Sequence, residues 1–406
     1  MKKQSKKMKS SSPAAAQPPV PEPVNAQPVQ PAACGGEIDA LRQEIDQMDA
    51  QIVSLINARA DKALKIGSLK ARDGVKPYNS SRELQVYRKI VAQNKGPLKD
   101  DALKSIYREI MSATIALERP TRVAFFGQLG TFTHLAARTK FGASVDYIPT
   151  RDMREVFNCV QHGEADYGLV PIENSTEGGV NQSIDMFSDT KLKIAAEIYL
   201  PIHNHLLCKG PMEGIRTLYS HPQPFAQCRH WISGHLATVE KLEVSSTAEA
   251  AERASKDPAA AAVAGTLASE IYGVPILFSN IEDSPNNITR FFVIAERMAE
   301  RTGKDKTSVV ILVKDEPGAL SRLLHPFTVH KINLTRIESR PSKRRAWEYN
   351  FFLDIEGHVM DENVQKALRE LEPKVRHLEV LGSYPMSERM PAASSLRPMP
   401  DETIKN

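Results

Sequence analysis

Cationic side chains interrupt the apolar stripe of a predicted helix in the first third of the chain. Arg59 is in phase with the apolar residues seven positions before and after it. Lys70 follows Arg59 by eleven residues, about three turns, so both lie on one helix face. Arg42 and Arg82 add two guanidinium groups. Burying like charges together is costly unless an anion compensates them. The set therefore indicates a small dianion inside a helical bundle, although each side chain alone could reach water from the stripe's edge.

Glu83, next to Arg82, has two interpretations. The run Ser80–Glu83 fits a capping box, in which the Glu83 carboxylate accepts a hydrogen bond from the Ser80 amide. Alternatively, the carboxylate binds a hydroxyl group of a ligand. The residues alone leave both interpretations open.

Four polar runs lie farther along the chain, and three of them stand where a predicted strand gives way to a loop or helix. The four runs are Gly127–Phe132, Pro171–Gly179, Ser220–Cys228 and Asn287–Phe292. In open α/β sheets, ligands bind beyond the carboxyl ends of strands, and helix N-termini there bind carboxylates. Each run taken singly is typical of an ordinary polar turn. The pair Gly127 and Gly130 lacks the third glycine of a dinucleotide-binding loop, so no dinucleotide site is supported.

The elements that must position the cations are helical. Apolar residues recur at steps of three and four in residues 37–119, which predicts helices over Glu37–Arg72, from about Ser81, and over Lys99–Leu117. The first helix would be about 54 Å long. A compact domain of this size has a radius of gyration of about 12 Å. We therefore expect its stripe to pack against a second copy of the chain or against another domain.

The rest of the chain alternates strands and helices. Residues 121–297 predict an α/β architecture, large enough for two lobes. Its expected strands are Arg122–Phe126, Tyr167–Pro171, His205–Cys208, Thr217–Ser220, Ala260–Ala264 and Phe291–Ala295. The helical stretches between them include Met153–His162, Pro222–Ser233 and Thr247–Ser255. Residues 305–385 predict a ferredoxin-like βαββαβ unit. Its strands are Ser308–Val313, Asn333–Ser339, Tyr349–Ile355 and His377–Leu381, and its helices are Ala319–His330 and Glu362–Glu372.

Composition excludes several classes of protein. The net charge is +4, but five lysines and one acid in residues 1–36 account for all of it, so no nucleic-acid surface is expected. No apolar run approaches the 18 residues of a membrane span, and no apolar segment of a secretory signal follows the N-terminal lysines. Four cysteines without ligand spacing favour a reducing cytoplasm and no metal. Residues 1–36 and 386–406 are expected to be disordered.

Residues 37–119 resemble the all-helical chorismate mutases, which are intertwined dimers. The resemblance rests on Leu41-Arg42, Asp49, Arg59, Gly67, Lys70 and Arg82-Glu83. It implies that Arg59, with Arg42 from a partner chain, binds substrate carboxylates. Lys70 would donate to the breaking ether oxygen, and Glu83 would bind the ring hydroxyl. Further implied pocket positions are Asn79, Arg82, Thr114 and Glu118. The rearrangement of chorismate to prephenate is pericyclic, so the site has to select a conformer and stabilise charge on the ether oxygen.

Two positions depart from the mutase pattern. Asn79 stands where aspartate is common, and Glu118 stands where some members have glutamine. A carboxyl group donates a hydrogen bond only when it is protonated. We therefore expect mutase activity to weaken as the pH rises above the pKa of Glu118.

The polar runs of residues 121–297 resemble prephenate dehydratase, chiefly through Thr289-Arg290-Phe291 and the run Pro171–Ser175. This resemblance implies a site between two α/β lobes, with Thr289 as the general acid for the hydroxyl that leaves as carbon dioxide is lost. Further implied positions are Thr131, Glu173, Asn174, Ser175, Ser220, Gln227, Arg290 and Phe291. A threonine is a weak acid, so its role depends on preorganised neighbours. Other candidate acids are His134, His162, His203, His205 and His221.

The last segment resembles the ACT regulatory domain of phenylalanine-sensitive dehydratases. The resemblance rests on Pro317–Leu320, Asn333–Thr335 and Glu338–Pro341. It implies that phenylalanine binds between paired ACT domains, with its carboxylate at the helix N-terminus after Gly318. The implied site residues are Gly318, Ala319, Leu320, Asn333, Leu334, Glu338, Ser339 and Arg340. A turn glycine and a solvated strand end are the alternative interpretation.

Together the three segments predict a cytoplasmic, phenylalanine-inhibited chorismate mutase–prephenate dehydratase that forms a homodimer or a higher homo-oligomer. We expect an all-α bundle at residues 37–120, a two-lobed α/β domain resembling periplasmic binding proteins at 121–297, and a ferredoxin-like α+β ACT domain at 305–385. No cofactor, metal, nucleic acid or membrane is expected. Two alternatives remain: a non-catalytic amino-acid sensor, and a dehydratase whose mutase domain is inactive because of Asn79.

Overall fold

A computed structural model describes residues 34–72, 79–313, 316–341 and 348–387. The two predicted tails lie outside this range except for residues 34–36 and 386–387. The chain divides after Asn57 into two units, and each is described by itself. Within the described residues, no helix has the length and apolar character needed to span a membrane.

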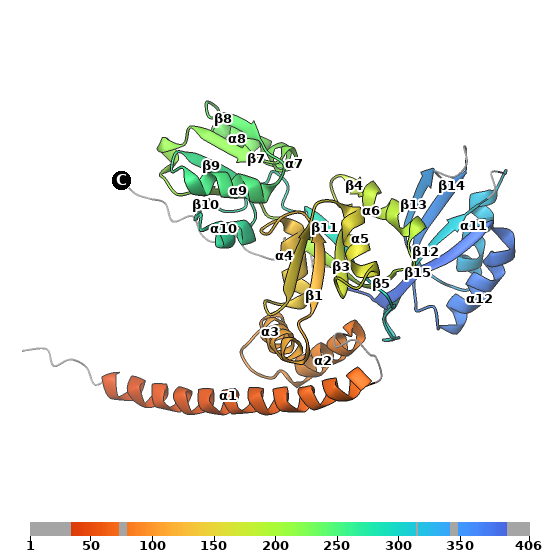
Figure 1. The fold of residues 1–406 in the computed structure, drawn as a ribbon, viewed down its shortest axis with the longest axis horizontal. Helices are drawn as coiled ribbons and strands as arrows, with labels where there is room; N and C mark the ends of the chain where they lie inside the picture. The colour runs from red at the N-terminus through yellow and green to blue at the C-terminus, as the bar shows by residue number, and fades with distance from the viewer. Residues whose placement is uncertain (1–33, 73–78, 314–315, 342–347, 388–406) are drawn as a thin grey trace, which may run out of the picture. The chain divides into compact units, whose positions relative to one another are not determined.

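Helix α1 spans Cys34–Arg72 and begins three residues before the predicted helix. Figure 1 shows it as one continuous helix. The apolar side chains of its first part are 37–69% exposed to solvent: Ile38, Leu41, Ile45, Met48, Ile52, Val53, Leu55 and Ile56. An exposed apolar surface of this length is typical of an interaction face.

Helices α2 (Ser80–Gln93) and α3 (Asp100–Glu118) agree with prediction to within about a residue. The N-cap of α2 is Asn79, whose side chain accepts a hydrogen bond from the Arg82 N–H, so Ser80 is not the N-cap that the predicted capping box requires. The Ser80 hydroxyl donates to the Ala195 carbonyl at 2.9 Å. The Ser81 hydroxyl donates to the Glu300 carbonyl at 2.6 Å. These bonds attach α2 to the α/β domain.

The first lobe of the α/β domain is a mixed sheet of order β2-β1-β3-β11-β5, with β4 paired to β3. Its strands are β1 (Arg122–Phe126), β2 (Asp146–Thr150), β3 (Tyr167–Asn174), β4 (Gly178–Gly179), β5 (Lys193–Pro201) and β11 (Ile288–Ala295). Helix α4 (Phe132–Phe141) covers one face, and helices α5 (Met153–Gln161) and α6 (Asn181–Met186) cover the other (Figure 1). Strand β11 runs antiparallel to β3 and β5 and returns the chain from the second lobe.

The second lobe is a five-stranded sheet of order β10-β6-β9-β7-β8. Its strands are β6 (His205–Cys208), β7 (Thr217–Ser220), β8 (Glu240–Glu243), β9 (Ala260–Ala264) and β10 (Ile276–Phe278). Its helices are α7 (Pro222–Gln227), α8 (Arg229–His235), α9 (Thr247–Lys256) and α10 (Thr266–Tyr272). The predicted helix Pro222–Ser233 is therefore two helices, because the backbone leaves helical geometry at Cys228 (φ −113°, ψ 19°).

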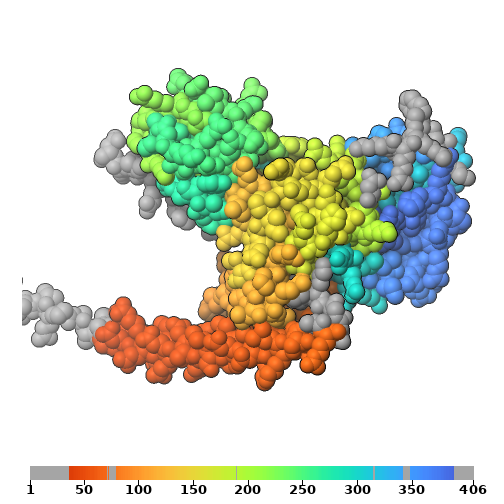
Figure 2. Space-filling view, in the orientation of Figure 1, coloured from red at the N-terminus to blue at the C-terminus, as the bar shows by residue number. Residues whose placement is uncertain are grey.

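The third domain has the predicted order of strands and helices. Its antiparallel sheet has the order β13-β14-β12-β15, from β12 (Asp305–Leu312), β13 (Leu334–Pro341), β14 (Tyr349–Glu356) and β15 (His377–Pro385). Helices α11 (Ala319–Val329) and α12 (Glu362–Leu371) pack on one face. The other face contributes Val310, Phe352, Leu381 and Tyr384 to the core around α5 and α6 of the first lobe. The two domains are in direct contact in the space-filling view (Figure 2).

Candidate active sites

A cavity of about 190 Å³ is lined by the C-terminal part of α1 together with α2, α3 and α4. Seven of the eight predicted mutase residues line it: Arg59, Lys70, Asn79, Arg82, Glu83, Thr114 and Glu118. The eighth, Arg42, belongs to the other unit, where its guanidinium forms an ion pair with Asp39 at 3.3 Å. Residues far apart in sequence are thus brought to one cavity.

The cavity is rich in cations. Five basic residues line it, Arg59, Lys70, Arg82, Arg108 and Lys140, against two acidic residues, Glu83 and Glu118. The Arg59 guanidinium donates to the Thr114 hydroxyl at 3.4 Å, and that hydroxyl donates to the Ile110 carbonyl at 2.7 Å. Thr114 is buried and therefore orients Arg59 toward the cavity. The arrangement suits a small dianion.

The Glu83 carboxylate is held by Tyr87 and Lys140. The Tyr87 hydroxyl donates to it at 3.0 Å, and the Lys140 ammonium binds it at 2.7 Å. Burial, with Glu83 nearby, raises the pKa of Tyr87, so the hydroxyl stays protonated and remains a donor. Lys140 belongs to α4 of the α/β domain. Lys140 was not predicted from the sequence, because no spacing within residues 37–119 points to a residue of the next domain.

Glu118 is the last residue of α3, and its side chain lies beside Gly67. A β-carbon at Gly67 would come within 2.7 Å of the Glu118 Cγ, so only glycine leaves the carboxylate room here. Burial raises the pKa of Glu118 above its ordinary value, and the Lys70 ammonium lowers it in part. The carboxyl group therefore keeps its proton to a higher pH than a free glutamate does.

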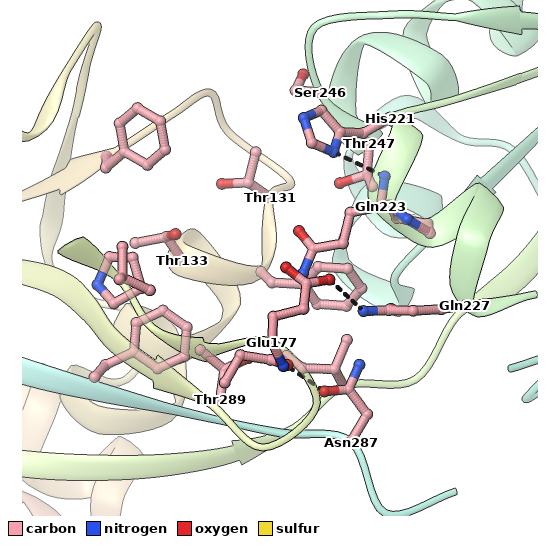
Figure 3. Close-up of a pocket in the computed structure, with 18 of the residues that line it drawn as sticks. Thr131, Thr133, Glu177, His221, Gln223, Gln227, Ser246, Thr247, Asn287 and Thr289 are labelled. Carbon is pink, nitrogen blue, oxygen red and sulfur yellow. Dashed lines mark hydrogen bonds between the residues drawn. The ribbon is translucent and has the colours of Figure 1, made fainter. Parts of the chain in front are cut away.

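A second cavity, of about 470 Å³, is lined by residues of both lobes of the α/β domain. Five of the nine predicted dehydratase residues line it: Thr131, Asn174, Gln227, Thr289 and Phe291. Among the described residues, no lysine or arginine does so. Across the cavity, the Gln227 side-chain amide donates to the Glu177 carboxylate at 3.4 Å (Figure 3).

Asn174 organises the floor of this cavity. Its side-chain oxygen accepts hydrogen bonds from the backbone N–H groups of Thr176 and Glu177 and from the Thr176 hydroxyl. Its nitrogen donates to the Asn287 side-chain oxygen at 2.8 Å and to the Thr289 hydroxyl oxygen at 2.9 Å. Both the oxygen and the nitrogen of this side-chain amide therefore have partners, and Asn174 positions its neighbours.

Four predicted dehydratase residues do not line the cavity. The Ser220 hydroxyl, which is fully buried, donates to the Val263 carbonyl within the second lobe. Ser175 instead bonds the backbone of residues 286 and 288. The Glu173 carboxylate lies 3.5 Å from the Arg336 guanidinium of the third domain. Arg290 follows Thr289 and points to the opposite side of the sheet, since side chains alternate along a strand.

The buried Arg290 guanidinium is part of a charge network between the first lobe and the third domain. It binds Glu197 on β5 at 2.7 Å and Asp354 on β14 at 2.5 Å, and it donates to the Tyr384 hydroxyl at 3.2 Å. Lys306 on β12 also binds Glu197, at 2.9 Å. Two cations and two carboxylates thus balance, and Arg290 holds the pKa of Asp354 below its ordinary value.

Three of the histidines considered as alternative acids have different environments in the structure. Burial lowers the pKa of His134 to about 4, and its Nδ1 accepts a hydrogen bond from the Gly130 N–H at 3.1 Å, so it is a neutral structural residue. His203 forms an ion pair with Glu282. His221 does line the cavity, where its ring caps α7 by accepting from the Gln223 N–H.

Other polar residues of the cavity were not predicted as site residues, among them Glu177, Gln223, Ser246, Thr247 and Asn287. Glu177, Gln223 and Asn287 lie inside the polar runs identified from the sequence. Ser246 and Thr247 lie at the start of α9, where Ser246 accepts a hydrogen bond from the Glu249 N–H. This position at a helix start was the sequence feature that could have identified them as site residues.

The residues predicted to bind phenylalanine lie at the start of α11 and along or next to β13. Gly318 caps α11 with a left-handed backbone (φ 78°), followed by Ala319 and the exposed Leu320. On β13, Glu338 packs against Gly179 of the first lobe, and Arg340 pairs with Asp185 at 3.4 Å. Asn333 and Leu334 stand at the start of β13, and Ser339 is exposed.

A helical domain with a cation-rich cavity, joined to a two-lobed α/β domain with a neutral polar cavity, defines an enzyme with two separate sites for small polar substrates. The family model for chorismate mutase type II matches residues 41–119. The model for prephenate dehydratase matches residues 123–299, and the model for the ACT domain matches residues 307–373.

Known proteins with the same organisation are similar to this chain. The bifunctional chorismate mutase/prephenate dehydratase of Aquifex aeolicus is 48% identical over 354 residues, which cover 86% of this chain and 98% of that protein. The chain therefore belongs to the bifunctional chorismate mutase/prephenate dehydratase family.

Two solved structures resemble the α/β and ACT portion. The prephenate dehydratase of Arthrobacter aurescens in complex with L-Phe is 36% identical, with a TM-score of 0.61, over 66% of this chain and 90% of that one. A structure described as a quorum-quenching acylase is 28% identical, also with a TM-score of 0.61, over 66% of this chain and 98% of that one.

Proposed function

We propose that the cation-rich cavity rearranges chorismate to prephenate. The observation that carries this assignment is the convergence of five basic side chains on one small cavity that also holds Glu118 with a raised pKa. Arg59 and Arg82 bind carboxylates of the dianion, and Lys70 and protonated Glu118 stabilise negative charge on the ether oxygen as it breaks. Glu83, fixed by Tyr87 and Lys140, receives the ring hydroxyl.

We also propose that the larger cavity converts prephenate to phenylpyruvate, carbon dioxide and water. Asn174 donates to the Thr289 hydroxyl oxygen, so the Thr289 proton is left to point toward the substrate. Thr289 donates that proton to the leaving ring hydroxyl as the carboxylate departs as carbon dioxide, and its alkoxide takes up a proton from solvent before the next turnover. Aromatisation of the ring supplies the driving force, so the cavity chiefly orients the substrate.

One pair of variants tests both assignments. Purified chain is given chorismate or prephenate, and prephenate and phenylpyruvate are followed separately. We expect Thr289→Ala to lower the dehydratase rate by about 10²–10⁴-fold with the mutase rate unchanged. Arg59→Ala should do the reverse, so each variant is the folding control for the other. Chorismate that is not consumed by the unaltered chain contradicts the mutase assignment, and prephenate that is not consumed contradicts the dehydratase assignment.

We propose that the ferredoxin-like third domain binds phenylalanine and thereby inhibits the dehydratase. Its β13 strand touches the wall of the dehydratase cavity, because Glu338 packs against Gly179, which lines that cavity. A change in β13 on binding therefore has a short path to the substrate. Calorimetric titration with phenylalanine, with the dehydratase rate measured in parallel, tests this. Binding without inhibition, or no binding, contradicts it.

We propose that a second copy of the chain covers the exposed apolar residues of α1 and brings its Arg42 to the mutase cavity. The exposed stripe between Ile38 and Ile56 supports this, since it is too long and apolar to face water alone. Mixing the Arg42→Ala and Arg59→Ala variants tests it. Each variant alone should lack mutase activity, and the mixture should regain it, because mixed dimers hold one intact site. A mixture that stays inactive contradicts the proposal.

A further inference from the structure

Asn287 is a buried side chain at the floor of the dehydratase cavity whose amide nitrogen has no partner. The residue is 2% exposed and lines the cavity. Its Nδ2 makes no hydrogen bond with any described residue. Leaving a buried donor unpaired is costly, and such groups are uncommon in folded proteins. A donor in this position indicates a ligand that completes it.

The orientation of this amide is fixed by its neighbours. Backbone N–H groups can only donate, and those of Thr176 and Glu177 point at one end of the Asn174 amide, at 3.0 and 3.2 Å. That end is therefore oxygen, and the Asn174 nitrogen faces Asn287. Asn287 must present its oxygen to this donor, as the dashed line in Figure 3 shows, so its own nitrogen is turned away from Asn174.

The backbone around Asn287 is also held in place. The Ser175 hydroxyl donates to the Asn286 carbonyl at 3.0 Å and accepts from the Ile288 N–H at 2.9 Å. The Asn287 carbonyl accepts from the Ile202 N–H at 2.8 Å. Asn287 is therefore a preorganised donor.

We propose that the Asn287 Nδ2 group binds an oxygen of the dehydratase substrate, beside the oxygen that Thr289 reaches. This inference rests on the proposed dehydratase function. The two residues are two positions apart on the same chain segment, and both accept from the Asn174 nitrogen. Both are consequently left with a proton to donate. A dianion in a cavity without lysine or arginine among its described lining must be bound by such neutral donors.

Replacing Asn287 with aspartate separates binding from scaffolding. In Asn287→Asp, a carboxylate oxygen still accepts from Asn174, so the scaffold is kept, whereas the donor becomes a negative charge. We expect dehydratase kcat/KM at neutral pH to fall by about 10–150-fold, the effect of losing one hydrogen bond to a charged group. The mutase rate of the same sample, which uses a separate cavity, should be unchanged.

The pH dependence gives a second readout. Below the pKa of the introduced carboxyl group, its proton can be donated again, so Asn287→Asp should regain activity relative to the unaltered chain. Asn287→Leu, which has no donor at any pH and adds no charge, should lose activity without that recovery. Near-normal dehydratase kcat/KM in either folded variant overturns the proposal. A loss in Asn287→Asp with no recovery in acid overturns it as well.

Failure of the underlying function has a different signature. If the unaltered chain does not turn over prephenate, the dehydratase assignment fails. The Asn287 proposal is then decided by calorimetric binding of prephenate to the unaltered chain and to Asn287→Asp. Weaker binding by the variant supports it, and equal dissociation constants, or no binding to either, overturn it.

Discussion

The two carboxylates of the mutase cavity have different environments and therefore different chemistry. The Glu83 carboxylate is paired with the Lys140 ammonium and accepts a hydrogen bond from the Tyr87 hydroxyl. Burial raises the pKa of Glu118 and so favours its neutral form, whereas the Lys70 ammonium lowers this pKa in part. In the proposed mutase function, one carboxylate therefore accepts a hydrogen bond from the substrate, and the other donates one when protonated.

We predict that mutase kcat/KM of the unaltered chain falls as the pH rises through the pKa of Glu118, which lies above the ordinary value of 4.5. The sign follows from the role, because only the protonated carboxyl donates to the ether oxygen. Glu118→Gln keeps a donor at every pH and should flatten the profile. Initial mutase rates across the acidic and neutral range test this. A profile that Glu118→Gln leaves unchanged would refute the role.

Gly67→Ala should lower mutase activity by displacing Glu118. The new β-carbon would overlap the Glu118 side chain, which must then swing out of its place in the cavity. We expect a loss of about tenfold or more in mutase kcat/KM, since misplacing one catalytic group by about 1 Å can cost up to 10²-fold. Gly36→Ala on the same helix, where a β-carbon meets nothing within 4 Å, is the matched control. Equal mutase rates in the two variants would contradict the prediction.

The candidate sites could be predicted from sequence where a residue and its neighbours share one local pattern. The helical spacing placed Arg59 and Lys70 together, and the polar runs contained Asn174 and Thr289. Lys140 could not be found, because its partner Glu83 lies 57 residues earlier in another domain. Ser220 stands in a promising run, but its hydroxyl bonds to a neighbouring strand, and such pairing is visible only in the fold.

At the level of elements, the strands and helices with strong local patterns were predicted within a few residues, and the strands β2, β4, β5, β8 and β10 were missed. Strand β5 shows why. It lies at the sheet edge but is covered on both faces, so it lacks the alternation that marks a half-buried strand. It also holds Glu197, a charge that argues against a buried strand until its partners Arg290 and Lys306, 93 and 109 residues away, are known.

The contact between β5 and β15 depends on a glycine. A β-carbon at Gly382 would lie 2.7 Å from the Ile194 backbone nitrogen, and backbone atoms cannot move aside as a side chain does. We predict that Gly382→Ala destabilises the chain by about 1–3 kcal/mol, measured by denaturant unfolding. Gly234→Ala, in a helix with open space around the new carbon, is the control and should be neutral or slightly stabilising. Equal losses in both variants would count against this packing argument.

At the scale of the whole molecule, the two cavities lie on one chain but differ in the charge of the residues that line them. Five basic residues line the mutase cavity, and no described lysine or arginine lines the dehydratase cavity. Substrate attraction to the first should therefore depend on long-range charge, and attraction to the second on short-range hydrogen bonds.

We predict that added salt weakens the mutase more than the dehydratase. Raising potassium chloride to about 1 M shortens the screening length to about 3 Å, which should raise the mutase KM for chorismate several-fold. The dehydratase KM for prephenate should change by less than about twofold over the same range. Steady-state kinetics on one preparation measures both, so the dehydratase is the internal control. Equal salt dependence of the two KM values would argue against the charge difference.

The buried network of Arg290, Glu197, Lys306 and Asp354 also bears on how this enzyme can be recombined with others. Each domain contributes one cation and one carboxylate, so a dehydratase cut off before Asp305 would keep the Arg290–Glu197 pair but lose its buried partners Lys306 and Asp354. A chimaera that carries a foreign ACT domain would need a lysine, an aspartate and a tyrosine at the positions of Lys306, Asp354 and Tyr384. The ACT domain is thus an integral part of the packed structure rather than an interchangeable attachment.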